Sequence, residues 1–462
     1  MARCVLSIGV LFPQVVSFQH GISSDFLPYY TTWKDALKLS SKAQPPPPVG
    51  LRPSDLCLEY TSGPEQSVAH RPSYHFHVAI AQGNVTAAQG WISFYSRSGG
   101  PFMPERYLDA GPAMHCAAKF GHSAILEMLF AVAPGALSAL TMEYAVEYGH
   151  VHCVDLLHRL GVDGCTHSLL DMAAVKGHLA VVEFLHFHRV EGGSMSAMDS
   201  ASRNGHLDVV QFLHWHRTEG CSEAALDGAA WGGHLDIVRF LHENRTEGCS
   251  RNAMDMAASE GHLHVVKYLH ENRREGCRAY AMDDAATYGH VDVVRFLHAH
   301  RREGCTLRAM NNAALNGHLE IVEFLHAHRK EGCSTFAMDW AARNGHLNIV
   351  RFLHFHRTEG CTTKAMDGAA MHGFVDIVRF LHEHREEGCT TEAMARAAAN
   401  GHLAVVQFLF EHRSEGFTPH AIRQAMSNGH KDIVHLLQQV RPILGRGEFD
   451  AIDVELEMWS GN

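Results

Sequence analysis

Cysteine and histidine are the residues of this sequence best suited to chemistry, because they bind metals, form disulfides and act as nucleophiles or bases. The 462-residue chain has 12 cysteines and 38 histidines. Both types recur in register. One histidine follows a glycine, as His346 does, and another follows Phe-Leu, as His354 does, often with a third two residues later. Eight cysteines share one position of a 28-residue spacing: Cys165, Cys221, Cys249, Cys277, Cys305, Cys333, Cys361 and Cys389.

The cysteine column is interpreted as packing. Equivalent residues of stacked helices lie about 8–10 Å apart, whereas the Cα atoms of a disulfide lie within about 7 Å. The sequence therefore predicts buried, reduced thiols between neighbouring units. Reduced thiols are typical of a reducing compartment, which makes the cytoplasm or the nucleus the expected location.

The histidine columns are interpreted in the same way. Two residues on a helix are about 200° apart, so His354 and His356 cannot hold one zinc ion. We expect hydrogen bonding in turns, with no metal and no cofactor. The net charge is −11 with neutral histidines, and histidine titrates near pH 6.5. The sequence therefore predicts sensitivity to acid.

No motif for catalysis is found. The chain lacks a P-loop, G-x-S-x-G, H-E-x-x-H and Cys-x-x-Cys, so no catalytic residues and no enzyme are predicted. An acidic chain without a basic stripe is not expected to bind nucleic acid. The sequence contains no run of 18 apolar residues, so no membrane span is expected. Residues 4–18 are apolar, which leaves a signal peptide as the alternative to a plain apolar N-terminus.

The elements that position these columns form a repeat. A glycine recurs every 28 residues from Gly121 to Gly429, which gives twelve units over residues 110–441. Each unit reads as two helices. The second has a helix-period apolar face, such as Ile349 and Val350 with Phe352 and Leu353. It is followed by Glu-Gly, where glycine could supply the left-handed stop.

The first helix of each unit is also recognisable. Ser or Thr comes one residue after the cysteine and is a typical N-cap, as at Thr362. Ala365, Met366 and Ala369-Ala370 then form a thin apolar stripe that allows a neighbouring helix to pack closely. Helix, Gly-His turn, helix and short loop together predict an all-α solenoid of about 12–13 stacked repeats.

The sequence outside the array divides into three segments. Residues 1–73 include Pro45 to Pro48 and have little pattern. Residues 74–109 contain a degenerate opening repeat, since terminal repeats are atypical. Residues 442–462 form a tail that is acidic after Arg446.

Residues 113–122, AMHCAAKFGH, resemble the ankyrin core P-L-H-x-A-A-x-x-G-H, and the following G-H-L-x-V-V-x-F-L pattern resembles the second ankyrin helix. The units lack about five of the 33 residues of an ankyrin repeat, so the β-hairpin fingers are expected to be shortened or missing. Asp283 and Asp367 stand where the family has histidine. The resemblance implies that the first helices line a concave groove where partners dock.

The positions that vary between units indicate the function. Those equivalent to 364, 368 and 371 lie opposite the Ala/Met stripe and change freely, while the stripe is nearly constant. Aromatic residues and arginine dominate protein interfaces. The sequence predicts a monomeric scaffold that binds a protein, such as a disordered segment, along this face. The alternatives are neutral variation on a structural spacer, or an enzyme within residues 1–110. The candidate binding residues are Trp231, Tyr280, Arg308, Phe336, Trp340, Arg343, Lys364 and Met371.

Overall fold

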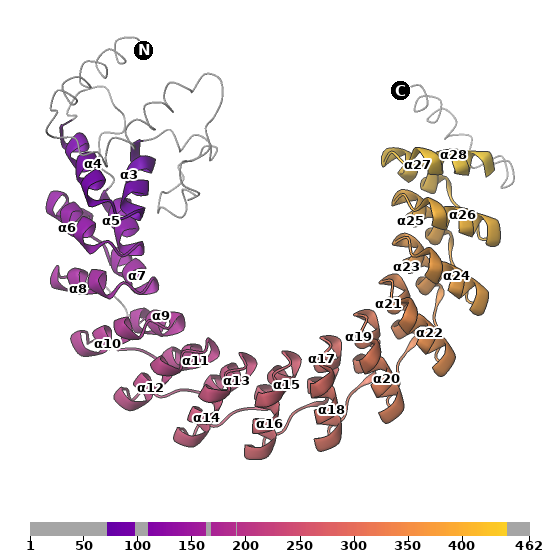
Figure 1. Cartoon of the computed structure of the whole chain (residues 1–462), viewed down its shortest axis with the longest axis horizontal. Helices are drawn as coiled ribbons and strands as arrows, with labels where there is room; N and C mark the ends of the chain where they lie inside the picture. Colours follow the sequence, from indigo (N-terminus) through magenta and orange to yellow (C-terminus); the bar gives the residue numbers. More distant parts are fainter. Residues whose placement is uncertain (1–71, 98–109, 163–167, 191, 441–462) are drawn as a thin grey trace, which may run out of the picture. The chain divides into compact units, whose positions relative to one another are not determined.

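The computed structural model describes residues 72–97, 110–162, 168–190 and 192–440. Within these ranges the chain forms α-helices and one short 3₁₀ helix, with no strand. The helices α3 to α28 form thirteen consecutive helix–turn–helix pairs, drawn as a series in Figure 1. The predicted all-α repeat fold without β-hairpin fingers is therefore confirmed. The chain divides into two compact units, Met1–Gly228 and Ala229–Asn462, and the boundary lies within α13.

In the first unit, each odd-numbered helix begins a repeat and the even-numbered helix completes it. The helices are α3 (Pro72–Ala81), α4 (Val85–Arg97), α5 (Ala110–Lys119), α6 (Ser123–Val132), η3 (Pro134–Ala136), α7 (Ala139–Glu147), α8 (Val151–Arg159), α9 (Ser168–Lys176), α10 (Leu179–His188), α11 (Met195–Arg203), α12 (Leu207–His216) and the start of α13 (Glu223–Trp231).

The second unit continues the same order. Its helices are α14 (Leu235–Asn244), α15 (Asn252–Ser259), α16 (Leu263–Asn272), α17 (Ala279–Thr287), α18 (Val291–His300), α19 (Leu307–Leu315), α20 (Leu319–His328), α21 (Thr335–Arg343), α22 (Leu347–His356), α23 (Thr363–Met371), α24 (Val375–His384), α25 (Thr391–Ala399), α26 (Leu403–His412), α27 (Pro419–Ser427) and α28 (Lys431–Val440).

The first helix of a repeat begins at a hydroxyl cap, as the sequence predicts. In α21 the Ser334 side chain accepts a hydrogen bond from the amide of Phe336, and Thr362 does the same for α23. A cap of this kind contributes about 1 kcal/mol. The Ala/Met stripe of α21 is buried and packs between α19 and α23. Small side chains permit this close approach of successive first helices.

The end of the second helix differs from the prediction. In α18 the helix ends at His300 and its C-cap, Arg301, is already extended. Gly304 does have positive φ, at 74°, but it lies in the following turn and does not stop the helix. The guanidinium of Arg301 pairs with Glu303 in the same turn. That carboxylate also accepts a hydrogen bond from the amide of Cys277 in the preceding repeat, at 3.5 Å.

The Arg-Glu pair recurs after each second helix of this unit from α16 to α26. Burial acts to raise the pKa of Glu359, but hydrogen bonds from Arg357 and from backbone amides outweigh it and lower the pKa to about 2. Burial also raises the pKa of the adjacent Cys333 thiol to about 11. The loop that replaces the β-hairpin finger is therefore held by a half-buried ion pair.

The Gly-His turn is fixed by two hydrogen bonds to the preceding repeat. The carbonyl of Leu315, at the end of α19, accepts one bond from Asn344 Nδ2 at 2.8 Å and one from His346 Nε2 at 3.1 Å. Gly317 has φ of 84°, and a Cβ built there would lie 2.7 Å from the ring of His346. The glycine is therefore required both by the turn and by the ring that covers it.

An aspartate in many of the first helices links that helix to the start of the next, and Asn311 does so in α19. Both oxygens of Asp283 accept hydrogen bonds from Thr306, one from its amide at 2.7 Å and one from its hydroxyl at 2.7 Å. Asp339 binds Thr362 in the same way. The pKa of Asp339 is raised by its burial, against which the Thr362 bonds act. The aspartates that replace the family's histidine thus join one repeat to the next.

Three predicted segments fall wholly or partly outside the described residues. Helices α3 and α4 occupy much of residues 74–109, but residues 98–109 are not described, so the degenerate opening repeat stays a prediction. Residues 1–71 and 441–462 also lie outside, and with them nearly all of the N-terminal segment and the acidic tail. Cys165 is likewise not described.

Candidate functional site

The variable positions of the first helices form an outward face in the second unit. On α21, Ala337 and Ala341 are fully buried, whereas Phe336 is 46% exposed and Arg343 is exposed. Tyr280 on α17 is 48% exposed, and Trp231 at the end of α13 is 37% exposed. We call these variable positions the outward face. The helix under each of its side chains is held on the opposite side by buried residues.

Two aromatic rings stack on α21. The centroids of Phe336 and Trp340 lie 5.1 Å apart and their planes differ by 9°. Trp340 is half-buried. Arg343 continues along the same helix and packs on α23, because a Cβ at Gly368 would lie 2.8 Å from Cβ of Arg343. The stack therefore presents a rigid apolar surface beside an exposed guanidinium.

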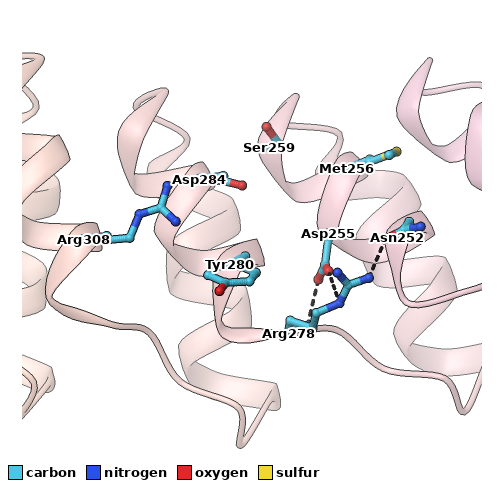
Figure 2. Close-up of a pocket in the computed structure, with 8 residues that line it drawn as sticks. All are labelled: Asn252, Asp255, Met256, Ser259, Arg278, Tyr280, Asp284 and Arg308. Atoms are coloured by element: carbon cyan, nitrogen blue, oxygen red, sulfur yellow. Dashed lines mark hydrogen bonds and ion pairs between the residues drawn. The ribbon is translucent and has the colours of Figure 1, made fainter.

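A second group of predicted residues lines an open hollow of about 310 Å³ between α15, α17 and α19. Figure 2 shows Tyr280 and Arg308 on one side of it and Met256 on the other. The Arg308 guanidinium lies over the Tyr280 ring, 5.6 Å from its centroid. Arg278 closes the lower edge through an ion pair with Asp255, Nε to Oδ2, at 3.2 Å.

The hollow contains two acidic side chains, Asp255 and Asp284. Asp255 is bound by Arg278, whereas no described residue donates a hydrogen bond to the carboxylate of Asp284. Burial raises the pKa of Asp284, and the charge of Arg308 opposes that shift. The hollow thus offers an acceptor and a guanidinium beside an aromatic ring. Such an arrangement can orient a polar chain, but it holds no nucleophile paired with a base.

The remaining predicted residues do not join either group. Trp231 donates from Nε1 to a carboxylate oxygen of Glu260, at 3.3 Å. The carbonyl of Met371 is bound by Asn400 and His402 of the next repeat, and its side chain is half-buried. Lys364 is exposed at the start of α23. The predicted set is therefore one outward face with two clusters, Phe336/Trp340 and Tyr280/Arg308.

The histidine columns are used within the repeat stack. His354 packs edge-on against Phe380 of the next repeat, with ring centroids 5.4 Å apart, and burial together with the nearby Arg385 lowers its pKa. His356 donates from Nδ1 to the carbonyl of Phe352 at 3.0 Å. The predicted hydrogen bonding in turns is confirmed for the Gly-His column, as at His346, whereas Nδ1 of His354 is buried without a hydrogen-bond partner among the described residues.

The cysteines of the described ranges are free and buried, which confirms the predicted burial of the column. Among the described residues, no three His, Cys, Asp or Glu side chains gather where they could hold a metal ion. In the same part of the chain, every helix is too short or too polar to cross a membrane.

Sequence reasoning missed two functional supports of this face. One is the Asp283–Thr306 link, and the other is the Asn344–His346 clamp on one carbonyl. A signal was available for both: Asp and Ser/Thr recur 23 residues apart, and Asn-Gly-His recurs as a unit. Both supports make the outward face rigid.

Successive helix pairs joined by repeated contacts, with a variable face on the first helix, define a helical repeat protein. Two family models match the chain. The model described as "Ankyrin repeats (3 copies)" matches residues 282–367 and 366–442, and the model described as "Ankyrin repeats (many copies)" matches residues 170–214, 198–242 and 221–270. The chain therefore belongs to the ankyrin repeat family, as its resemblance implied.

A solved structure with detectable similarity is the crystal structure of the human ASB11 ankyrin repeat domain. It shares 20% sequence identity with the chain, and the match covers 41% of this chain and 96% of that domain with a TM-score of 0.31. No curated protein sequence matches the chain.

Proposed function

We propose that this protein is a non-catalytic scaffold that binds another protein along the outward face of α13 to α23. Ankyrin repeats are generally protein-interaction modules. The observation that carries the proposal is the Phe336–Trp340 stack, because exposed aromatic rings on a rigid helix are typical of the centre of an interface. A preorganised surface loses little conformational entropy on binding, so more of the contact energy contributes to affinity.

The competing function is a structural spacer without a partner site. A spacer requires only the contacts between repeats, which recur at the Asp, Asn-Gly-His and Arg-Glu positions. It gives no reason for aromatic residues at Tyr280, Phe336 and Trp340, where smaller polar side chains such as Asn252 and Asn312 occur in sister repeats.

Partner capture with photo-cross-linking separates the two functions. A photoreactive residue replaces Asn312, beside the aromatic stack, and the cross-linked proteins are compared with those from a Trp340→Ala version. We expect a discrete partner whose yield falls at least tenfold with Trp340→Ala, because a buried aromatic anchor is worth about 2 kcal/mol or more. The matched control is Phe355→Ala, an exposed ring on the second helix α22, which should retain the partner. Equal yields of cross-linked partner from all three versions would reject the binding face and favour the structural spacer.

We further propose that the chain is a monomer of the cytoplasm or nucleus. The free, buried cysteines support a reducing compartment. Thiol titration of the unfolded protein purified without reductant should find essentially all 12 cysteines free. Linked pairs would contradict the proposed reducing compartment, and stoichiometric zinc would contradict a metal-free cysteine column. Light scattering above the mass of one chain would contradict the monomer.

A further inference from the structure

The outward face changes its charge along the second unit. The three helices α19, α21 and α23 carry three cations and no acid at their variable positions, although the whole chain has a net charge of −11. These positions are Arg308, Asn312 and Leu315, then Phe336, Trp340 and Arg343, then Lys364, Gly368 and Met371. We call Arg308, Phe336, Trp340, Arg343 and Lys364 the cationic–aromatic patch.

The three cations of the patch are not used inside the protein. Within the described residues, the side chains of Arg308, Arg343 and Lys364 make no hydrogen bond or ion pair, and Arg308 rests on the Tyr280 ring. Arginines of the second helices and loops differ. Arg295 pairs with Glu320 at 2.7 Å, and Arg329 pairs with Glu331. An arginine laid on an aromatic ring keeps its in-plane N–H groups available for a carboxylate.

The acids nearest the patch offset its charge only in part. Asp339 is 2% exposed and its oxygens accept hydrogen bonds from Thr362, although its charge still acts on Lys364. Asp367 is bound to Thr390 on the side of α25. Beyond the patch, Glu392 pairs with Arg396 at 2.8 Å. Asp284 faces the Arg308 guanidinium across the hollow beside Tyr280 and makes no hydrogen bond to it.

We propose that the patch binds an acidic peptide segment that carries an aromatic or large apolar anchor. The anchor packs on the Phe336–Trp340 stack, and carboxylates on either side bind Arg308, Arg343 and Lys364. Three repeats about 10 Å apart make the patch about 20 Å long, which matches about six residues of extended chain. This inference rests on the proposed function and specifies the chemistry of its partner.

A peptide fits this patch better than single-stranded nucleic acid does. Nucleic acid could stack its bases on the two rings, but its binding depends on neutralising a run of phosphates along a positively charged groove. On the helices that flank the patch, Asp284 and Glu392 occupy variable positions of the same face. A short acidic segment needs only the three cations that are present.

The test is a selection from a random peptide library of about twelve residues on the full-length chain. We expect the enriched pool to be acidic, with an aromatic or large apolar residue near its centre. The same selection is run on the charge-reversed version Arg308→Glu, Arg343→Glu, Lys364→Glu, where the acidic preference should disappear. A matched control reverses three exposed loop cations, Arg274→Glu, Arg302→Glu and Lys330→Glu, and should keep the preference.

The most enriched peptide is then measured by fluorescence anisotropy. Its affinity should fall at least tenfold with the patch reversal, less than about threefold with the loop reversal, and strongly at high salt because exposed charges are screened. An enriched pool that is neutral or basic, an unchanged affinity after patch reversal, or tighter binding of single-stranded oligothymidylate would each overturn the proposal.

Failure of this inference can be told from failure of the proposed function. A neutral or basic pool that is lost with Trp340→Ala would keep the protein-binding face and reject the acidic partner. A pool that is unaffected by Trp340→Ala would reject both. Circular dichroism of each version, with unchanged helix content and melting temperature, ensures that these exposed changes act on binding.

Discussion

The surfaces between repeats and the outward face of the first helices obey different rules. Between repeats, the same kinds of contact recur with the 28-residue period: an Asp on the next cap, a turn histidine on the preceding carbonyl, joined in some repeats by an Asn, and an Arg-Glu pair. On the outward face, one position changes from Tyr280 to Arg308 to Phe336 to Lys364. The contrast separates stability from recognition by position, since each repeat touches only its neighbours.

Deleting chain in whole or half repeats is the strongest way to break this comparison. Removal of residues 277–304, one complete 28-residue unit, should leave a folded array, because Asp255 can then cap the helix at Thr306 as Asp283 does. Removal of residues 277–290 joins a second helix to another second helix. That deletion should abolish cooperative unfolding of the unit, measured by circular dichroism in urea. Equal damage from both deletions would refute nearest-neighbour stacking.

Glycine replacements measure the Gly-His turn. Gly317→Ala should destabilise the protein by about 2–3 kcal/mol, because a positive φ costs about 1–2 kcal/mol for alanine and the new Cβ meets the His346 ring at 2.7 Å. Urea unfolding measures the loss.

Gly429→Ala is the matched control for the glycine experiment. Gly429 has φ of 77° in the equivalent turn, but no atom of the described residues lies within 4 Å of a Cβ placed there. This change should cost only the backbone strain of the positive φ, about 1–2 kcal/mol. Similar losses at the two glycines would mean that the histidine ring moves aside freely.

The histidine of the turn should make stability depend on pH. Burial lowers the pKa of His318, although its hydrogen bond to the carbonyl of Thr287 acts in the opposite direction. The pKa of His318 in the folded protein therefore lies below the unfolded value of about 6.5. Between these two pKa values the unfolded chain binds more protons than the folded protein does. The stabilisation is complete above pH 6.5 and is lost as the pH falls toward the folded pKa.

One repeat provides a natural reference for this effect, because Phe374 stands where the others have histidine. His318→Phe should lose about 1 kcal/mol at pH 7.5 through the missing hydrogen bond, but its stability should fall less between pH 7.5 and 5.5. Phe374→His should steepen the same fall. Urea midpoints at the two pH values measure both changes, and parallel pH profiles for all three proteins would exclude a contribution from this column.

The fold could be predicted from the sequence because its contacts are periodic. The buried Ala337-Met338 stripe and the Ser334 cap follow from local pattern alone. The end of the second helix could not be predicted in this way. The extended Arg301 pairs with the Glu303 carboxylate, which also binds the amide of Cys277, 26 residues from Glu303. Local helix propensity contains no information on such a contact.

The candidate site was predictable only in part. Exposure of Phe336, Tyr280 and Arg343 follows from the helix period opposite the stripe. The hollow beside Tyr280 depends on how far Arg308 of the next repeat lies from that ring, and this is set by the packing between α17 and α19. The sequence predicts which residues face outward, while the stack decides which of them meet.

Replacement of Trp340 should have the smallest effect on stability and so sharpens the division between the two surfaces. Its half-buried ring stacks on Phe336, itself 46% exposed, so Trp340→Ala should lose mainly an aromatic pair, about 1 kcal/mol or less. Met338→Ala is the matched control on the same helix. Met338 is 2% exposed, and its truncation should cost about 2–5 kcal/mol through the cavity it leaves. Differential scanning calorimetry should therefore show a nearly unchanged melting temperature for Trp340→Ala and a clear decrease for Met338→Ala. Binding of the partner should nevertheless weaken by about 30-fold for Trp340→Ala, since about 1.4 kcal/mol corresponds to a tenfold change in affinity. A comparable loss of stability in both variants would place Trp340 in the core and move the binding face elsewhere.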